Sequence, residues 1–142
     1  MNASSLLRCA VVATLLMVSP SCSAVADSPD APVELGAEFT LAAGASADLD
    51  QDRMTVLFAE VPEDSRCPEG TACMWAGDAT IVAEVTVGAQ RSRQELHSNR
   101  RFATGATVGG YRIELVAVHP SPPAGGRVPA ADYRVDLLVT RA

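Results

Sequence analysis

Lysine is absent from this chain, and all 11 of its basic residues are arginine. Acidic residues number 17, so the formal net charge is −6 at pH 7. The largest arginine cluster is the pair Arg100-Arg101. Because binding to nucleic acid depends on many basic side chains that neutralise phosphates, we expect no nucleic-acid partner for this protein.

The sequence also lacks an apolar run long enough to cross a membrane as a helix. Its most apolar segment, Cys9 to Val18, is much shorter than the roughly 20 residues that a spanning helix needs. Arg8 precedes this segment and Ser19-Pro20-Ser21 follows it, which is typical of an export signal. We therefore predict an export signal over residues 1–26 and a protein that leaves the cytoplasm.

Two maturation routes are open for this signal. Ala24-Val25-Ala26 fits the small-x-small pattern for cleavage before Asp27, whereas Ser21-Cys22 resembles a lipobox whose cysteine receives a lipid. We favour cleavage, because Ser19 and Pro20 do not match the residues that a lipobox prefers. The protein is then secreted or periplasmic, and a lipid on Cys22 would be its only membrane attachment.

No segment after residue 38 keeps a helical period for three turns, but several alternate between apolar and polar residues, as half-buried strands do. Gly88-Ala89 and Gly109-Gly110 suit the turns between strands, and residues 120–131 suit a long proline-rich loop. We expect an all-β antiparallel sandwich or closed barrel of seven or eight short strands over residues 38–142, after a flexible lead over 27–37. The predicted strands are 39–41, 46–49, 55–61, 78–87, 93–97, 111–118 and 133–139.

Four cysteines occur, and only Cys67 and Cys73 lie beyond the predicted signal and lipobox. In an oxidising compartment this pair is expected to form one disulfide. Pro68 and Gly70 fit the second and fourth positions of a type I turn that begins at Cys67. The resulting small closed loop is predicted to be a structural element.

Trp75, the only tryptophan, has the strand parity of Ala79 and Ile81. If no bulge intervenes, its indole packs on the disulfide at one end of the core; a bulge at Gly77 would turn it to the opposite face. Arg66 is expected to anchor the loop through a carboxylate, since its guanidinium offers planar bidentate geometry. We favour a scaffolding role for this segment over an active site.

The same segment contains a pattern of spaced residues: Asp64, Ser65, Arg66, Cys67, Pro68, Cys73, Trp75, Gly77 and Ala79. This pattern resembles the signature of a family of small bacterial exported proteins and lipoproteins of unknown function, and the likeness extends over about residues 38–142. The resemblance implies export and a domain without assigned catalytic residues.

Motifs for catalysis and for cofactors are missing: the chain has no Gly-rich phosphate loop, no nucleophile elbow and no H-E-x-x-H. Residues 48–52 begin like a calcium loop, but Arg53 and Ala59 stand where that loop needs Gly and Glu. His97 and His119 would need a free thiolate to form a blue-copper site. We therefore expect no catalytic residue, no metal and no cofactor.

These observations favour a non-enzymatic binding module of the cell envelope or the medium, with a protein partner. A protease inhibitor that presents a rigid loop is the first alternative. An envelope protein that binds copper or calcium is the second.

Overall fold

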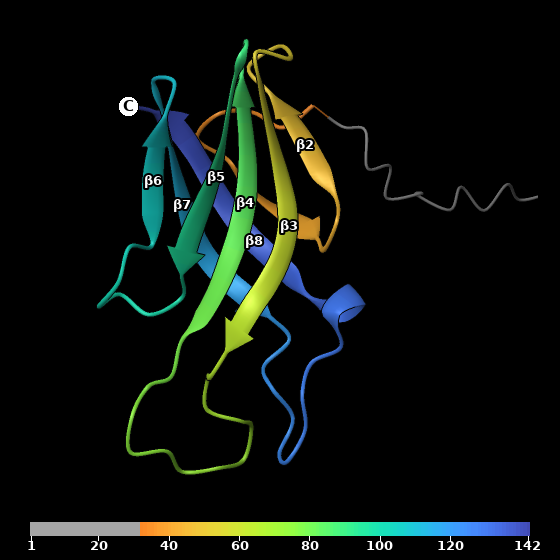
Figure 1. Cartoon of the computed structure of the whole chain (residues 1–142), viewed down its shortest axis with the longest axis vertical. Helices are drawn as coiled ribbons and strands as arrows, with labels where there is room; N and C mark the ends of the chain where they lie inside the picture. The colour runs from red at the N-terminus through yellow and green to blue at the C-terminus, as the bar shows by residue number, and fades with distance from the viewer. Residues whose placement is uncertain (1–31) are drawn as a thin grey trace, which may run out of the picture.

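The computed structural model describes residues 32–142, and these fold into two packed antiparallel sheets of four strands each (Figure 1). Sheet I has the strand order β2-β3-β4-β5, and sheet II has the order β1-β8-β7-β6. The all-β prediction is confirmed, and because the sheets do not close on each other, the fold is the β-sandwich of the two predicted alternatives and not the closed barrel. The elements are β1 (Glu38–Ala42), β2 (Ser46–Leu49), β3 (Met54–Asp64), β4 (Ala79–Val87), β5 (Gln90–His97), β6 (Gly105–Val108), β7 (Tyr111–His119), the 3-10 turn η1 (Ala130–Asp132) and β8 (Arg134–Arg141).

The core lies between the sheets and is built by the predicted alternation. In β8, Val135, Leu137 and Val139 are buried while their neighbours face outward. Phe58 is the largest fully buried side chain and enters the core from the middle of β3. Because each strand contributes alternate residues, the two inner faces together supply one continuous apolar cluster.

Val82 breaks the alternation of β4, and the structure explains the exception. It is only 1% exposed although both of its neighbours point into the core. On the outer face of sheet I it lies between Glu60 of β3 and Glu95 of β5. Glu60 is ion-paired with Arg93, so the stems of long charged side chains cover this valine.

The short strand β6 is absent from the predicted set. Its four residues include Gly105 and Ala106, which carry almost no apolar side chain to generate an alternating pattern. The strand exists because it pairs with β7 in register from Gly105–Glu114 to Val108–Tyr111. A β-carbon on Gly105 would stand 2.7 Å from the carbonyl oxygen of Ile113, so this pairing also requires glycine.

The chain joins the sandwich ahead of β1. Val33 forms a parallel bridge with Leu49, and the amide of Gly36 donates to the carbonyl of Val139. The lead therefore contacts both sheets before the expected boundary at residue 38. The predicted signal over residues 1–26, Cys22 and the first part of the lead lie outside the described residues.

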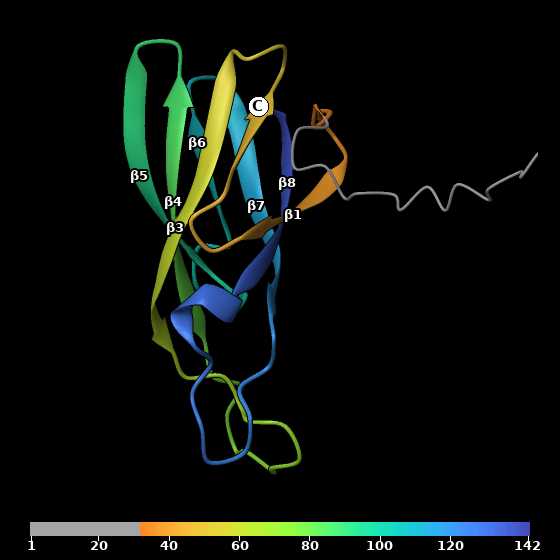
Figure 2. The same cartoon turned by 90° about the vertical axis from the view of Figure 1, so that its right-hand side faces the viewer.

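The sandwich has two unlike ends. At one end lie short turns, among them 88–89 and 109–110, where positive φ angles confirm the predicted glycine turns. Three long connections, 65–78, 98–104 and 120–133, gather at the other end, which we call the loop end (Figures 1 and 2). Val33 lies beside Leu49 at the short-turn end, far from the loop end.

The acidic segment 48–52 runs from the end of β2 into the expected turn before β3, which covers residues 50–53. Asp50, Gln51 and Asp52 all adopt positive φ. Asp50 accepts a hydrogen bond from the hydroxyl of Tyr111 and is ion-paired with Arg141, 2.7 Å away. Its carboxylate thus ties this turn to sheet II. No helix of the described residues is long and apolar enough to cross a membrane.

Replacement of Phe58 by Ala tests the assignment of the core. We expect it to lower the free energy of unfolding by about 3–5 kcal/mol, because it removes a fully buried ring and leaves a cavity. Leu57→Ala is the matched control, since the adjacent side chain faces outward and is only partly buried. Urea denaturation measures both changes, and equal losses would contradict the register of β3.

Candidate functional site

The loop end brings together segments that are distant in the sequence. The connection 65–78 between β3 and β4 runs beside the connection 120–133 between β7 and β8 (Figures 1 and 2). One backbone hydrogen bond joins them directly, from the amide of Glu69 to the carbonyl of Pro122. The third connection, 98–104, is attached to the first by the side chain of Asn99. The three loops therefore form one surface.

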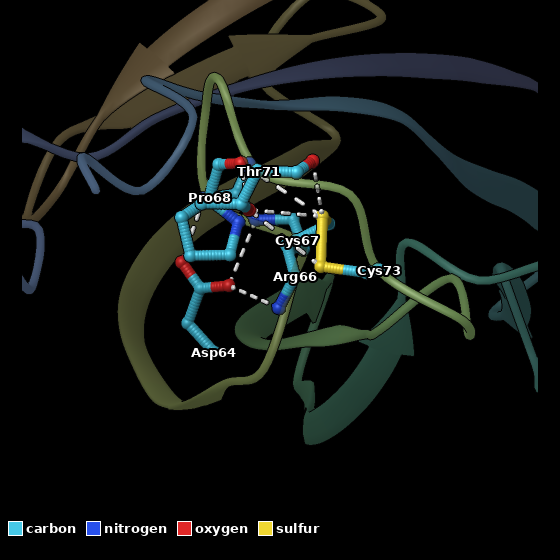
Figure 3. The surroundings of a disulfide bond; sticks show 6 residues. All are labelled: Asp64, Arg66, Cys67, Pro68, Thr71 and Cys73. Carbon is cyan, nitrogen blue, oxygen red and sulfur yellow. Dashed lines mark hydrogen bonds and ion pairs between the residues drawn. A yellow bond between two sulfur atoms is a disulfide. The ribbon is translucent and has the colours of Figure 1, made fainter. Parts of the chain in front are cut away.

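Cys67 and Cys73 form the predicted disulfide, with 5.9 Å between their α-carbons (Figure 3). The bridge closes a small ring at the outer part of connection 65–78. A disulfide of this kind persists in an oxidising, extracytoplasmic environment. By limiting the conformations of the unfolded chain, it also stabilises the folded loop.

Arg66 anchors the base of this loop, as predicted. Its Nε donates to Oδ1 of Asp64 at 2.8 Å, and its Nη2 donates to Oδ2 at 2.6 Å (Figure 3). The same guanidinium donates to the carbonyls of Val118 at 2.5 Å and Pro120 at 2.8 Å. Since these carbonyls belong to β7 and the loop that follows it, Arg66 links the two sheets at the loop end.

Asp64 has a second partner on sheet II. The hydroxyl of Tyr133 donates to its Oδ2 at 2.9 Å. Burial raises the pKa of Asp64, but the hydrogen bonds from Arg66 and Tyr133 and the nearby positive charge outweigh it, so the pKa lies below its usual value. The carboxylate therefore stays ionised and holds both partners.

The turn inside the disulfide ring begins one residue later than predicted. The amide and the hydroxyl of Thr71 both donate to the carbonyl of Pro68. Pro68 is thus the first residue of the turn, and Gly70 is its third, with a φ of +72°. A positive φ at the third position is typical of a type II turn, which favours glycine there.

Asp78 is a second point of attachment. Its Oδ2 lies 2.6 Å from Nδ1 of His97, and its Oδ1 accepts from the amide of Asn99 at 2.9 Å and the hydroxyl of Ser98 at 3.2 Å. Burial raises the pKa of Asp78, but these hydrogen bonds lower it more, so it lies below its usual value. The ionised carboxylate holds connection 98–104 against the start of β4.

Gly77 allows the two ends of connection 65–78 to meet. A β-carbon at this position would stand 1.7 Å from the carbonyl oxygen of Ser65, which no rearrangement of a side chain can relieve. The amide of Ser65 donates to the carbonyl of Asp78 at 2.7 Å, which closes the loop at its base. Glycine is thus required here because two backbone segments approach closely, and not because of the bulge considered from the sequence.

The prediction that Trp75 packs on the disulfide in the core is wrong. Its side chain is 79% exposed, and that of its neighbour Met74 is 90% exposed. The parity argument fails because β4 begins only at Ala79, and alternation does not continue through an irregular segment. Ala79 itself is fully buried, so the chain leaves the core directly before it.

The two histidines bind different carboxylates. His97, at the end of β5, contacts Asp78, whereas Nε2 of His119, at the end of β7, lies 2.9 Å from Asp136. Residues 32–142 contain no group of three or more His, Cys, Asp or Glu side chains placed to hold a metal ion.

Several residues of the loop end carry no signal in the sequence. Asn99 and Phe102 sit in a polar connection without a motif, and only the fold brings them to Asp78 and His97. Comparison of the chain with protein-family models, curated proteins and solved structures gave no match. The function must therefore be inferred from the chemistry of the loop end.

Arg66→Met tests the anchor at the base of the loop. We expect a loss of roughly 3 kcal/mol in the free energy of unfolding, because Asp64 and two carbonyls lose their shared partner. Arg91→Met is the control, since Arg91 is ion-paired with Glu84 but 70% exposed, and should cost less than about 1 kcal/mol. A loss for Arg66→Met as small as that expected for Arg91→Met, measured by urea denaturation, would show that the anchor is dispensable.

The lowered pKa of Asp64 predicts a contribution to acid unfolding. Its carboxylate stabilises the folded state above the usual pKa of 3.8, and this contribution is lost as the pH falls through the lower pKa of the folded state. Asp64→Asn should therefore be less stable than the parent at neutral pH but lose less further stability toward about pH 3. The control is Asp52→Asn, at an exposed turn residue. Its free energy of unfolding, measured in urea at each pH, should change with pH as that of the parent does.

Proposed function

We propose that this protein is an exported, non-enzymatic binding module that holds a protein partner at its loop end. The observation that carries the proposal is the exposure of Met74 and Trp75, 90% and 79%, on a loop whose base is fixed. Large apolar side chains stay in water at a cost unless a partner covers them, and tryptophan is enriched among the residues that dominate binding energy. The proposed export depends on the signal predicted over residues 1–26, and the disulfide supports it.

The construction of the loop supports this proposal. Arg66 holds the first part of the loop, the disulfide closes its middle, and Asn99 donates to the carbonyls of Ala76 and Gly77 just after the exposed pair. This loop is fixed on both sides of Met74 and Trp75, the exposed pair that we call the tip. Such a loop loses little conformational entropy when it binds. Such preorganisation favours recognition over a purely structural role.

The orientation of the domain is also consistent with binding. The chain enters the sandwich at Val33, at the short-turn end, whereas Trp75 lies at the loop end. If Cys22 carries a lipid, the attachment joins the protein opposite its exposed apolar tip. Met74 and Trp75 would then face away from the anchoring membrane and could contact a partner in the surrounding space.

The alternatives have less support. A protease inhibitor presents an extended segment to the cleft of the protease, but the loop between Cys67 and Cys73 forms a tight turn from Pro68 to Thr71. For a copper or calcium protein, residues 32–142 offer no group of three or more His, Cys, Asp or Glu side chains placed to hold an ion, and Asp50 of the acidic turn already binds Tyr111 and Arg141. The binding-module proposal uses the exposed pair directly.

Capture of partners from the host tests the proposal. The parent protein and Val116→Ala, an exposed valine on sheet II, should retain the same exported protein from the medium or envelope, whereas Trp75→Ala should retain it at least about tenfold less. Trp75→Ala should unfold within about 0.5 kcal/mol of the parent, because its ring is exposed.

Two outcomes would contradict the proposal. Equal retention by all three proteins would show that Trp75 does not bind the partner. A loss of several kcal/mol in the unfolding of Trp75→Ala would show that the ring belongs to the packed structure.

A further inference from the structure

A polar groove of about 380 Å³ lies beside the disulfide loop, on the outer face of sheet I at the loop end. Its floor is a row of three side chains in register across three strands: Glu63 of β3 faces Thr80 of β4, which faces His97 of β5. Because these residues are paired through the backbone, the floor is rigid. Its volume lies within the range of about 300–1,000 Å³ found for small-ligand sites.

One wall of the groove is aromatic. Phe102 is 55% exposed, and its ring centroid lies 5.1 Å from that of His97 at a tilt of 41°. The loop that carries Phe102 is held by Asp78, which binds Ser98 and the amide of Asn99. The exposed face of the phenyl ring is therefore kept in place rather than free to collapse.

A second wall is backbone. Ala76 and Gly77 line it, and the side-chain amide of Asn99 donates to their carbonyls at 3.2 and 3.3 Å. Asn99 thus attaches this wall to connection 98–104, which carries Phe102.

Three hydrogen-bonding groups in the groove are free to meet a ligand. Within residues 32–142, the carboxylate of Glu63 and the guanidinium of Arg101 have no hydrogen bond or ion pair. His97 uses Nδ1 for Asp78 and Thr80, which leaves Nε2 without a partner among the same residues. The groove therefore offers unpaired hydrogen-bonding groups, of which the imidazole of His97 is held in place by Asp78.

The mixture of groups selects one class of ligand. Glu63 and Asp78 repel a phosphate, and Arg101 opposes a cation, so neither charge is favoured. A purely apolar ligand would bury polar groups without partners. A pyranose ring satisfies the site, because its hydroxyls both donate and accept while its C–H face packs on an aromatic ring.

We propose that this groove binds a pyranose glycan, neutral or N-acetylated, through stacking on Phe102 and hydrogen bonds to Glu63, His97 and Arg101. This site is separate from the one proposed for Met74 and Trp75. An exported module that holds a protein at its tip and a polysaccharide at its side would link the two.

The test uses four probes: peptidoglycan sacculi and chitin in co-sedimentation, and chitotetraose and cellotetraose in titration calorimetry. We expect saturable binding to at least one of them. Phe102→Ala should weaken it at least about tenfold by loss of stacking, and Glu63→Ala several-fold by loss of an exposed acceptor. Trp75→Ala and Val116→Ala should bind like the parent protein.

The variants also separate the two proposals. Loss of binding in Trp75→Ala but not in Glu63→Ala would assign the glycan to the loop tip and overturn the groove site. No binding to any probe, or binding unaffected by both Phe102→Ala and Glu63→Ala, would overturn it as well. Because the side chain of Glu63 is exposed and has no hydrogen bond or ion pair in residues 32–142, Glu63→Ala should unfold like the parent in urea, and a loss of binding then reports on the groove.

Discussion

The loop end depends on the guanidinium of Arg66. A positive charge placed at the seam between two sheets must be compensated, and here one carboxylate and two backbone carbonyls do so. Asp64 supplies the carboxylate, and Tyr133 reaches it from the other sheet. The end of β3, the end of β7 and the start of β8 therefore meet at one point, and the disulfide loop projects from it.

At the loop end, the residues that hold the structure are different from the residues that are exposed. Arg66, Gly77 and Asp78 lie at the base, where they bind backbone or allow it to approach closely. Met74 and Trp75 lie at the tip, where they contribute little to packing. A fixed base with an exposed apolar tip is the arrangement that a binding surface requires, because the base has already lost the entropy that binding would otherwise cost.

Asp78 connects the two sites that we propose. Through Ser98 and Asn99 it positions the connection that carries Phe102, and through His97 it sets the floor of the polar groove. Asn99 in turn holds the carbonyls just after Trp75. One hydrogen-bonded unit therefore supports both proposed sites, whereas Val33 joins the sandwich at the short-turn end.

What the sequence determined by itself is local: alternation placed the strands and the core side of β8, glycine pairs placed the short turns, and the cysteine pair with its neighbouring arginine indicated a closed, anchored loop. The tertiary structure alone decided that the sheets remain open, that β6 exists and that Trp75 is exposed. The physical reason is that parity holds only within a paired strand. Beyond Asp64 the path of the chain is set by contacts with residues some 20 to 70 positions away, such as those of Asp78 with Asn99 and of Asp64 with Tyr133, which no local pattern records.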